Sequence, residues 1–227
     1  MADKKNVDVS GEEMIAKAKD FWTRNSKAIL GICGAIIVLG GGWLVYKNFF
    51  KAPKEAKASD ALFKAEEYYR MDSLNLALNG DGQNMGFLRV ISKFGGTDAA
   101  NLAHFYAGSC YIKLNDNEKA ITHLKDFSTS SKFIQAKAYK LLGDAYADQG
   151  KNSDALSAYK KAARHFEADK TASSEALFLA AYLADRVMKN KDEAIALYKE
   201  LKEKYPATLY GNQADNYLAQ LGVYNVN

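Results

Sequence analysis

The sequence predicts an all-α protein, with one N-terminal transmembrane helix followed by an α-solenoid of about four helical hairpins and a C-terminal capping helix. Two observations carry this prediction. An uncharged run of nineteen residues, 28–46, lies near the N-terminus. Downstream, apolar residues recur at helical spacing, and one hairpin pattern returns after 35 to 39 residues. With only 2 prolines in 227 residues, long helices meet few interruptions.

Composition excludes several classes of protein. A hydrophobic content of 48% with 26% charged residues is typical of a folded chain. The net charge of +4 comes from 31 basic and 27 acidic residues that are mixed along the sequence. No basic patch stands out, so we expect no nucleic-acid partner. Cys33 and Cys110 lie in different predicted segments, and we interpret both as free thiols rather than a disulfide framework.

Residues 1–27 are predicted to form a cytoplasmic tail with an amphipathic helix. Ser10 and Glu13 make a capping box, and apolar residues from Met14 to Trp22 recur on one face. This helix either lies on a membrane surface with its lysines near the head groups or is an ordinary solvated helix. The sequence leaves both interpretations open.

Residues 28–46 are predicted to be the transmembrane helix. As a helix, the run is roughly 28 Å long, close to the ~30 Å thickness of the hydrocarbon core. Trp22, Trp43 and Tyr46 suit the aromatic belts at the two interfaces. A cleavable signal peptide is the main rival, but 27 residues precede the run, and aromatic and basic residues rather than a small-residue cleavage site follow it. An uncleaved single-pass anchor is therefore favoured.

Residues 47–57 are predicted to be a basic juxtamembrane connector that contains Pro53, and residues 58–227 a repeat domain. Basic residues flank the span almost equally, so the charge bias decides little about orientation. The short head and the long tail favour a cytoplasmic N-terminus and an exported C-terminal domain.

The clearest repeat is the stretch from Tyr139 to Ala162, which predicts two short antiparallel helices. Leu142 and Gly143 lie on the first helix, and Gly150 opens the turn. The second helix carries Ala155, Tyr159 and Ala162. This pattern of small residues and aromatics resembles the tetratricopeptide repeat (TPR) consensus. A single hairpin cannot bury its apolar face, so the motif predicts neighbouring repeats.

Degenerate copies of the pattern lie on both sides. A step of 35 residues back from Gly143 and Tyr159 reaches Gly108 and Leu124, and a step of 39 forward from Tyr159 reaches Tyr198. We assign the additional residues of the longer step to an insertion at 166–173, followed by a helix at 175–188. The remaining predicted parts are a divergent leading repeat at 55–97 with an insertion at 71–86 and a turn at 79–82, and a last helix at 208–221.

The front of the chain resembles the YfgM-like family of membrane-anchored TPR proteins. The resemblance rests on Phe21, Asn25, Lys27-Ala28 and Gly42-Trp43 around the glycine-rich span. The stretches NLALNGDGQNMGFL and GGTDAANLAHFYAG resemble a Bacteroidetes-type branch and depart from better-known members. The resemblance implies a bacterial inner-membrane protein with a periplasmic TPR domain, associated with the Sec translocon and with periplasmic chaperones.

TPR arrays bind ligands on the surface lined by the first helix of each hairpin. An alternative is that the chain's own terminal helices cover the apolar positions, since large bare apolar patches are rare. The sequence does not predict a clamp for C-terminal carboxylates, because Phe105, Ser109 and Leu141 stand where such a clamp needs lysine and asparagine. A groove with apolar ends and a charged middle suits an extended peptide or a helix. By register, the groove residues are Leu102, Phe105, Ser109, Ile112, Lys137, Lys140, Asp144, Asp148, Leu179 and Leu183.

Nothing in the sequence predicts catalysis, a cofactor or a metal site. His104, His123 and His165 lack metal-ligand spacing, and we interpret His104 as a core histidine. We therefore expect a membrane-anchored interaction module with a translocon subunit, a periplasmic chaperone or a client as partner. One alternative is a scaffold that self-associates through the groove and the span, in which Gly31 and Ala35 lie four residues apart. Another is an adaptor that faces the cytoplasm, if the topology is reversed. The oligomeric state stays open.

Overall fold

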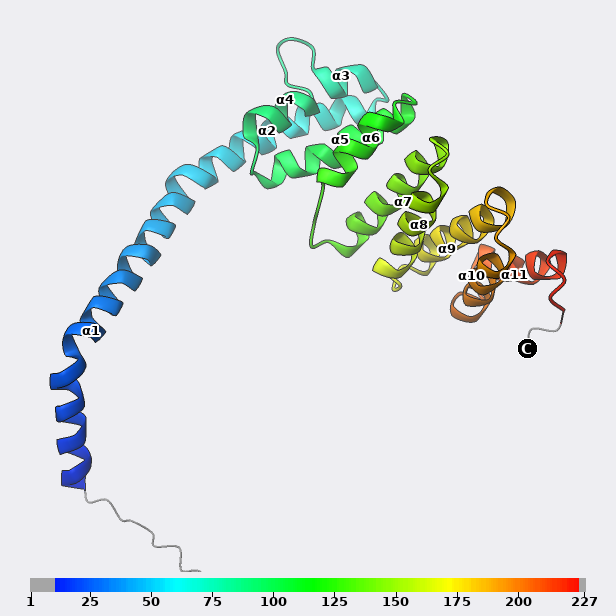
Figure 1. The fold of residues 1–227 in the computed structure, drawn as a ribbon. Coiled ribbons are helices and arrows are strands. Elements are labelled where there is room, and N and C mark those ends of the chain that lie inside the picture. Colours follow the sequence, from blue (N-terminus) through cyan, green and yellow to red (C-terminus); the bar gives the residue numbers. More distant parts are fainter. Residues whose placement is uncertain (1–10, 225–227) are drawn as a thin grey trace, which may run out of the picture. The chain divides into compact units, whose positions relative to one another are not determined.

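The computed structural model describes residues 11–224 and divides into two units, Met1–Pro53 and Lys54–Asn227 (Figure 1). The described part of the chain is helical throughout its regular structure, with one isolated antiparallel bridge between Gly80 and Met85. The all-α class, with one long apolar N-terminal helix and a helical repeat region, is confirmed.

The first unit consists of one helix that continues into a π-helical segment. α1 (Gly11–Val45) joins the predicted amphipathic and apolar stretches without a break, and η1 (Tyr46–Lys51) follows. The predicted capping residue Ser10 and the tail before it lie outside the described residues. By length and composition, this is the one helix in the described part of the chain that could cross a membrane.

The second unit is a row of helices in which each element from α4 to α11 packs against the next. α2–α4, α5–α6, α7–α8 and α9–α10 form four hairpins, and α11 follows as a terminal helix. The bounds are α2 (Ala52–Arg70), α3 (Leu74–Asn79), α4 (Phe87–Phe94), α5 (Asp98–Lys113), α6 (Asn117–Asp126), α7 (Lys132–Asp148), α8 (Asn152–His165), α9 (Lys170–Tyr182), η2 (Leu183–Val187), α10 (Lys191–Lys204) and α11 (Leu209–Gln220).

In every hairpin, a residue with a left-handed backbone lies two positions after the end of the first helix, which in the last hairpin continues into η2. These residues are Asp72, Asn115, Gly150 and Lys189, with φ between 55° and 70°. After α5, the Asn115 amide donates to the Ile112 carbonyl, and the next amide donates to the carbonyl of Tyr111. This pairing satisfies carbonyls that a helix end leaves free. The left-handed residue recurs after 43, 35 and 39 residues (72, 115, 150 and 189), and this spacing marks the four repeats.

Gly143 and Gly108 let the second helix of their hairpins approach closely. A Cβ added at Gly143 would lie 2.5 Å from the Tyr159 ring, and one at Gly108 would lie 2.5 Å from Leu124. The sequence pairs these same residues at a step of 35. The predicted match between small residues and large side chains is thus confirmed in both hairpins.

The insertion in the leading hairpin is ordered by Asp81. Its carboxylate accepts hydrogen bonds from the backbone amides of Gln83 and Asn84 and from the hydroxyl of Tyr68, which lies 2.7 Å away. The predicted turn at 79–82 is present, but the short helix α3 before it was not predicted. These bonds fix the loop against α2.

One expected boundary in the second unit was wrong. The loop between α8 and α9 is only Phe166–Asp169, and α9 begins at Lys170 rather than at 175. The additional residues mainly lengthen α8, which has 14 residues where α6 has 10. Two residues of the predicted connector contact the repeat region: Lys54 donates to the Gly95 carbonyl, and Glu55 accepts from the first amides of α5.

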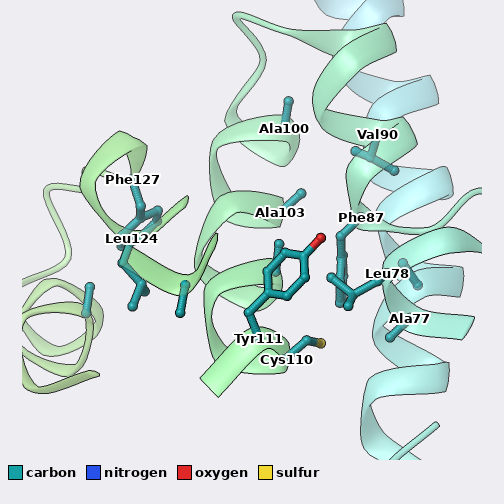
Figure 2. Close-up of a cluster of buried hydrophobic side chains, with 14 of the residues drawn as sticks. Ala77, Leu78, Phe87, Val90, Ala100, Ala103, Cys110, Tyr111, Leu124 and Phe127 are labelled. Atoms are coloured by element: carbon teal, nitrogen blue, oxygen red, sulfur yellow. The ribbon is translucent and has the colours of Figure 1, made fainter. Parts of the chain in front are cut away.

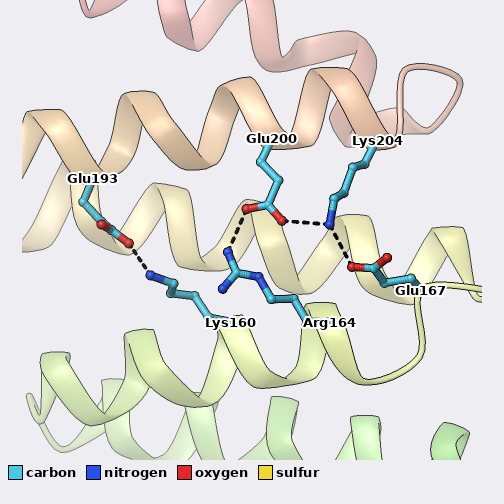
Figure 3. Close-up of polar contacts among 6 residues, drawn as sticks. All are labelled: Lys160, Arg164, Glu167, Glu193, Glu200 and Lys204. Carbon is cyan, nitrogen blue, oxygen red and sulfur yellow. Dashed lines mark hydrogen bonds and ion pairs between the residues drawn. The ribbon is translucent and has the colours of Figure 1, made fainter.

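Two apolar clusters form the core of the second unit. The first runs from α2 to α8, and Figure 2 shows Phe87 and Leu124 approaching α5 from opposite sides. The second cluster runs from α8 to α11 around Tyr198. Ion pairs also join α8 to α10, with Lys160 to Glu193 at 2.6 Å and Arg164 to Glu200 at 2.8 Å (Figure 3).

Candidate interaction groove

A cavity of about 580 Å³ lies within the second unit, and we call it the groove. The first helices of all four hairpins contribute to its wall, together with the end of α8 and the loop that follows it. The side chains discussed below are Tyr69, Leu102, Phe105, Ser109, Phe133, Ile134, Lys137, Lys140, Phe166, Asp169 and Glu175.

One part of the groove is apolar. Leu102 and Phe105 are three residues apart on α5, so both lie on the same face of that helix. Phe133 and Ile134, in the first turn of α7, complete this part of the wall. Phe133 remains 44% exposed, which leaves apolar surface that a ligand could cover.

The charged part of the groove is built around Lys140. Its ammonium lies 3.0 Å from the Asp144 carboxylate on the same helix and 3.7 Å from Glu175 on α9. Burial opposes the charge on Lys140, but these two carboxylates outweigh it and raise its pKa. Lys140 and Glu175 are thus already neutralised by neighbours within the protein.

Lys137 differs from the other charged groups of the groove. Asp169 accepts the Ala172 amide as the N-cap of α9, so its carboxylate is in use. The Lys137 ammonium lies 4.8 Å from the centre of the Phe133 ring, a cation–π contact. Among residues 11–224 no carboxylate forms an ion pair with it. The groove therefore offers one positive charge beside an exposed aromatic ring.

Half of the sequence-predicted groove residues line the cavity: Leu102, Phe105, Ser109, Lys137 and Lys140. Ser109 is nearly buried, and its hydroxyl lies 2.7 Å from that of Tyr69. It therefore contributes to the floor of the groove rather than to its exposed wall.

The other five lie elsewhere. Asp144 is turned toward the second helix of its own hairpin, where it accepts a 2.9 Å hydrogen bond from the Tyr159 hydroxyl. Asp148 is exposed and accepts a 3.4 Å hydrogen bond from Asn117 at the start of α6. Ile112 and Leu179 are half-buried and pack against the two core clusters. Leu183, in η2, is only 6% exposed and does not line the groove.

Sequence reasoning missed several groove residues. Phe133 could have been found, because it lies four positions before Lys137 and such residues share a helix face. Tyr69 could not be placed without an exact register for the divergent leading hairpin. Phe166 and Asp169 were assigned to an insertion, although they form the short connection that closes one end of the groove.

Metal binding and thiol chemistry find little support. Within residues 11–224, no group of three or more histidine, cysteine or acidic side chains could hold a metal ion. Burial raises the pKa of the Cys110 thiol to about 12, which keeps it protonated and unreactive near neutral pH.

Comparison with known proteins agrees with the repeat architecture. Residues 102–130 and 175–208 match the tetratricopeptide repeat family model. The hairpin with the clearest motif, α7–α8, lies between these two segments. A comparison with curated proteins found no match. The two matched segments therefore resemble tetratricopeptide repeats, which indicate a module for protein–protein interaction.

Proposed function

We propose that this protein is a membrane-anchored interaction module whose groove binds an extended peptide segment of a partner protein. The peptide places apolar side chains against Leu102, Phe105 and Phe133 and an acidic side chain against Lys137. The anchor is α1, and the apolar run 28–46 crosses the membrane.

The observation that carries this proposal is the pairing of Phe133 and Lys137. Both side chains are exposed and lie next to each other in the wall of the groove, and within the described residues each lacks the partner that its chemistry favours. An apolar ring gains free energy when a ligand covers it, and a lysine without a carboxylate favours an acidic ligand. Asp169 and Glu175 do not compete for that role, because each already has a partner.

The cellular setting follows from the resemblance of the N-terminal region to YfgM-like proteins. We propose that the groove works in the periplasm of a bacterium, at the Sec translocon or in envelope protein folding. Its partner is then a translocon subunit, a periplasmic chaperone or a client protein. A protease-protection assay on spheroplasts tests the side of the membrane: the second unit should be digested without lysis, and protection until lysis would overturn the periplasmic assignment.

Photo-crosslinking of the full-length protein in native membranes tests the groove. A photoreactive residue replaces Phe133, and the same residue replaces Phe63 as the matched control. Phe63 is 52% exposed and also lies beside a lysine ammonium, Lys64, at 5.7 Å, but it does not line the groove. Products formed from position 133 are identified by mass spectrometry.

We expect a defined envelope protein to be captured from position 133 and not from position 63. Lys137→Glu should abolish that product, while Lys64→Glu should leave it unchanged. Equal products from both positions, or none from position 133, would refute the groove as the binding site. A product that is a dimer of this chain would favour the self-associating scaffold instead.

A further inference from the structure

Two histidines meet between the helices of the α5–α6 hairpin. His104 on α5 and His123 on α6 place their Nδ1 atoms 3.2 Å apart, and both rings are half-buried. Neutral imidazole carries one donor and one acceptor nitrogen, so one Nδ1–H donates to the other Nδ1. The contact requires that at least one ring be neutral.

Few groups around the pair can stabilise the positive charge that a second proton would add. The Tyr111 ring stacks on His123 with centroids 5.5 Å apart, and Lys119 lies over the same tyrosine at 5.3 Å. Lys119 is itself paired with Asp116 at 2.6 Å. Asp126, at the end of α6, is the carboxylate that acts electrostatically on both histidines. The environment is therefore mainly aromatic, with one acidic group.

Burial lowers the pKa of both rings. For His104 the charge of Asp126 opposes this effect, but burial outweighs it. For His123 the proximity of His104 lowers the pKa further. Both effects favour the neutral pair in the folded hairpin near pH 7.

We propose that the His104–His123 contact makes the α5–α6 hairpin acid-sensitive: protonation of both rings removes the hydrogen bond and loosens α5 from α6. With two protons on the pair, neither Nδ1 can accept, and two positive charges face each other at hydrogen-bond distance.

The hairpin also shapes the groove, so loosening it has a consequence for binding. α5 carries Leu102 and Phe105, which line the apolar part of the cavity. The Phe105 ring packs against Phe127, which follows α6 directly, with ring centroids 5.4 Å apart. Separation of the two helices removes support from Phe105. Acid thereby weakens the groove without any change in the groove residues themselves. This inference does not depend on which ligand the groove binds.

The sign of the pH effect follows from linkage. The pKa of each histidine is lower in the folded chain than in the unfolded one, where it is about 6.5. The unfolded chain therefore binds protons first as the pH falls. The stabilisation that the pair contributes is fully present above about pH 6.5. It is lost as the pH falls below that value, until the folded rings are protonated too. Each pKa unit between the two states changes the folding constant about tenfold.

Hydrogen exchange of the full-length protein in detergent micelles, followed by mass spectrometry between pH 7 and pH 5, tests the proposal. His123→Gln removes the pair, and His104→Gln is a second variant in case the first does not fold. His165→Gln is the control, because that ring packs against Tyr139 rather than against another histidine. Exchange is corrected for the intrinsic effect of pH.

In the wild type, and equally in the His165 variant, peptides from 98–126 should lose protection about tenfold or more between pH 7 and pH 5, while peptides from 191–204 keep theirs. In the His123 or His104 variant this additional loss should disappear. The proposal is overturned if wild type and pair variants lose protection equally, or if the loss is uniform along the second unit. It also fails if ¹⁵N spectra show both rings already protonated at pH 7.

Discussion

The contact between Gly143 and Tyr159 gives the sharpest prediction about stability. In Gly143→Ala, the added methyl would lie 2.5 Å from two carbons of the Tyr159 ring. The ring cannot easily move, because it is 5% exposed and its hydroxyl is bonded to Asp144 at 2.9 Å. The backbone of α7 or α8 must shift instead, so the substitution should destabilise the hairpin although alanine favours a helix.

The magnitude follows from two opposing effects. Overpacking a tight core costs about 1–3 kcal/mol, and replacing glycine by alanine within a helix returns about 0.5–1 kcal/mol. We expect a net loss of about 1–2 kcal/mol, which lowers Tm by about 2–4 °C per kcal/mol in a domain of this size. Thermal unfolding of the full chain in detergent micelles, followed by circular dichroism, measures the change.

Two matched variants sharpen this test. Gly108→Ala should also destabilise its hairpin, because the added methyl would lie 2.5 Å from the side chain of Leu124, which is only 1% exposed. Gly34→Ala meets no heavy atom within 4 Å and should not destabilise the second unit. If Gly143→Ala unfolds at the wild-type temperature or above, the close approach of α7 and α8 does not limit the packing of this hairpin.

Three further predictions concern single side chains. Glu55→Gln should lower the free energy of unfolding by about 1 kcal/mol, because the Glu55 carboxylate accepts two 2.8 Å hydrogen bonds from the first amides of α5. Thermal unfolding measures the change, and an unchanged Tm would contradict this role. In a Cys33→Ser background, the Cys110 thiol should resist iodoacetamide at pH 8 until the chain is unfolded, because burial raises its pKa to about 12. Rapid labelling of the native protein would contradict that burial. The pKa of the Asp81 carboxyl is lowered, first by the hydrogen bond from the Asn84 backbone amide and then by that from the Tyr68 hydroxyl. Its ¹³C resonance should therefore not titrate near pH 4, and the loop should keep its contacts at that pH. A titration midpoint near pH 4 would mean that these bonds do not persist in solution.

The repeat spacing was predictable because steric demands recur along the chain. A large side chain on the second helix needs a small residue opposite, so the period is visible in the order of residue types alone, with Gly143 matched to Tyr159 and Gly108 to Leu124. The helix ends were less visible. Gly150 signals a left-handed residue, whereas Asn115 and Lys189 adopt the same conformation without being glycine.

The predicted groove differs from the structure at one repeated position. Ser109, Asp144 and Leu183 are equivalent at steps of 35 and 39, but only Ser109 lines the groove, at its floor, while Asp144 and Leu183 lie elsewhere. Helical periodicity indicates which residues share a face, but it does not fix how far that face is rotated toward the neighbouring helix. The equivalent residues Leu102, Lys137 and Ala176 do line the groove. All three residues at the position of Leu102 therefore lie in the cavity wall, whereas at the position of Ser109 only one does.

The charge of the groove could not be read from the sequence, because it depends on pairs that form between helices. Lys137 and Lys140 look alike in one dimension, yet Glu175 on another helix reaches only Lys140. Within residues 11–224 this difference leaves the Lys137 ammonium without a carboxylate beside an exposed ring, a small set of contacts that suits modest affinity. An anchor in the membrane compensates for modest affinity, because it confines the groove to the surface where a membrane-bound partner also moves and so raises the effective concentration. The proposed function therefore predicts that releasing the second unit from its anchor weakens capture of the partner, even though every groove residue is kept.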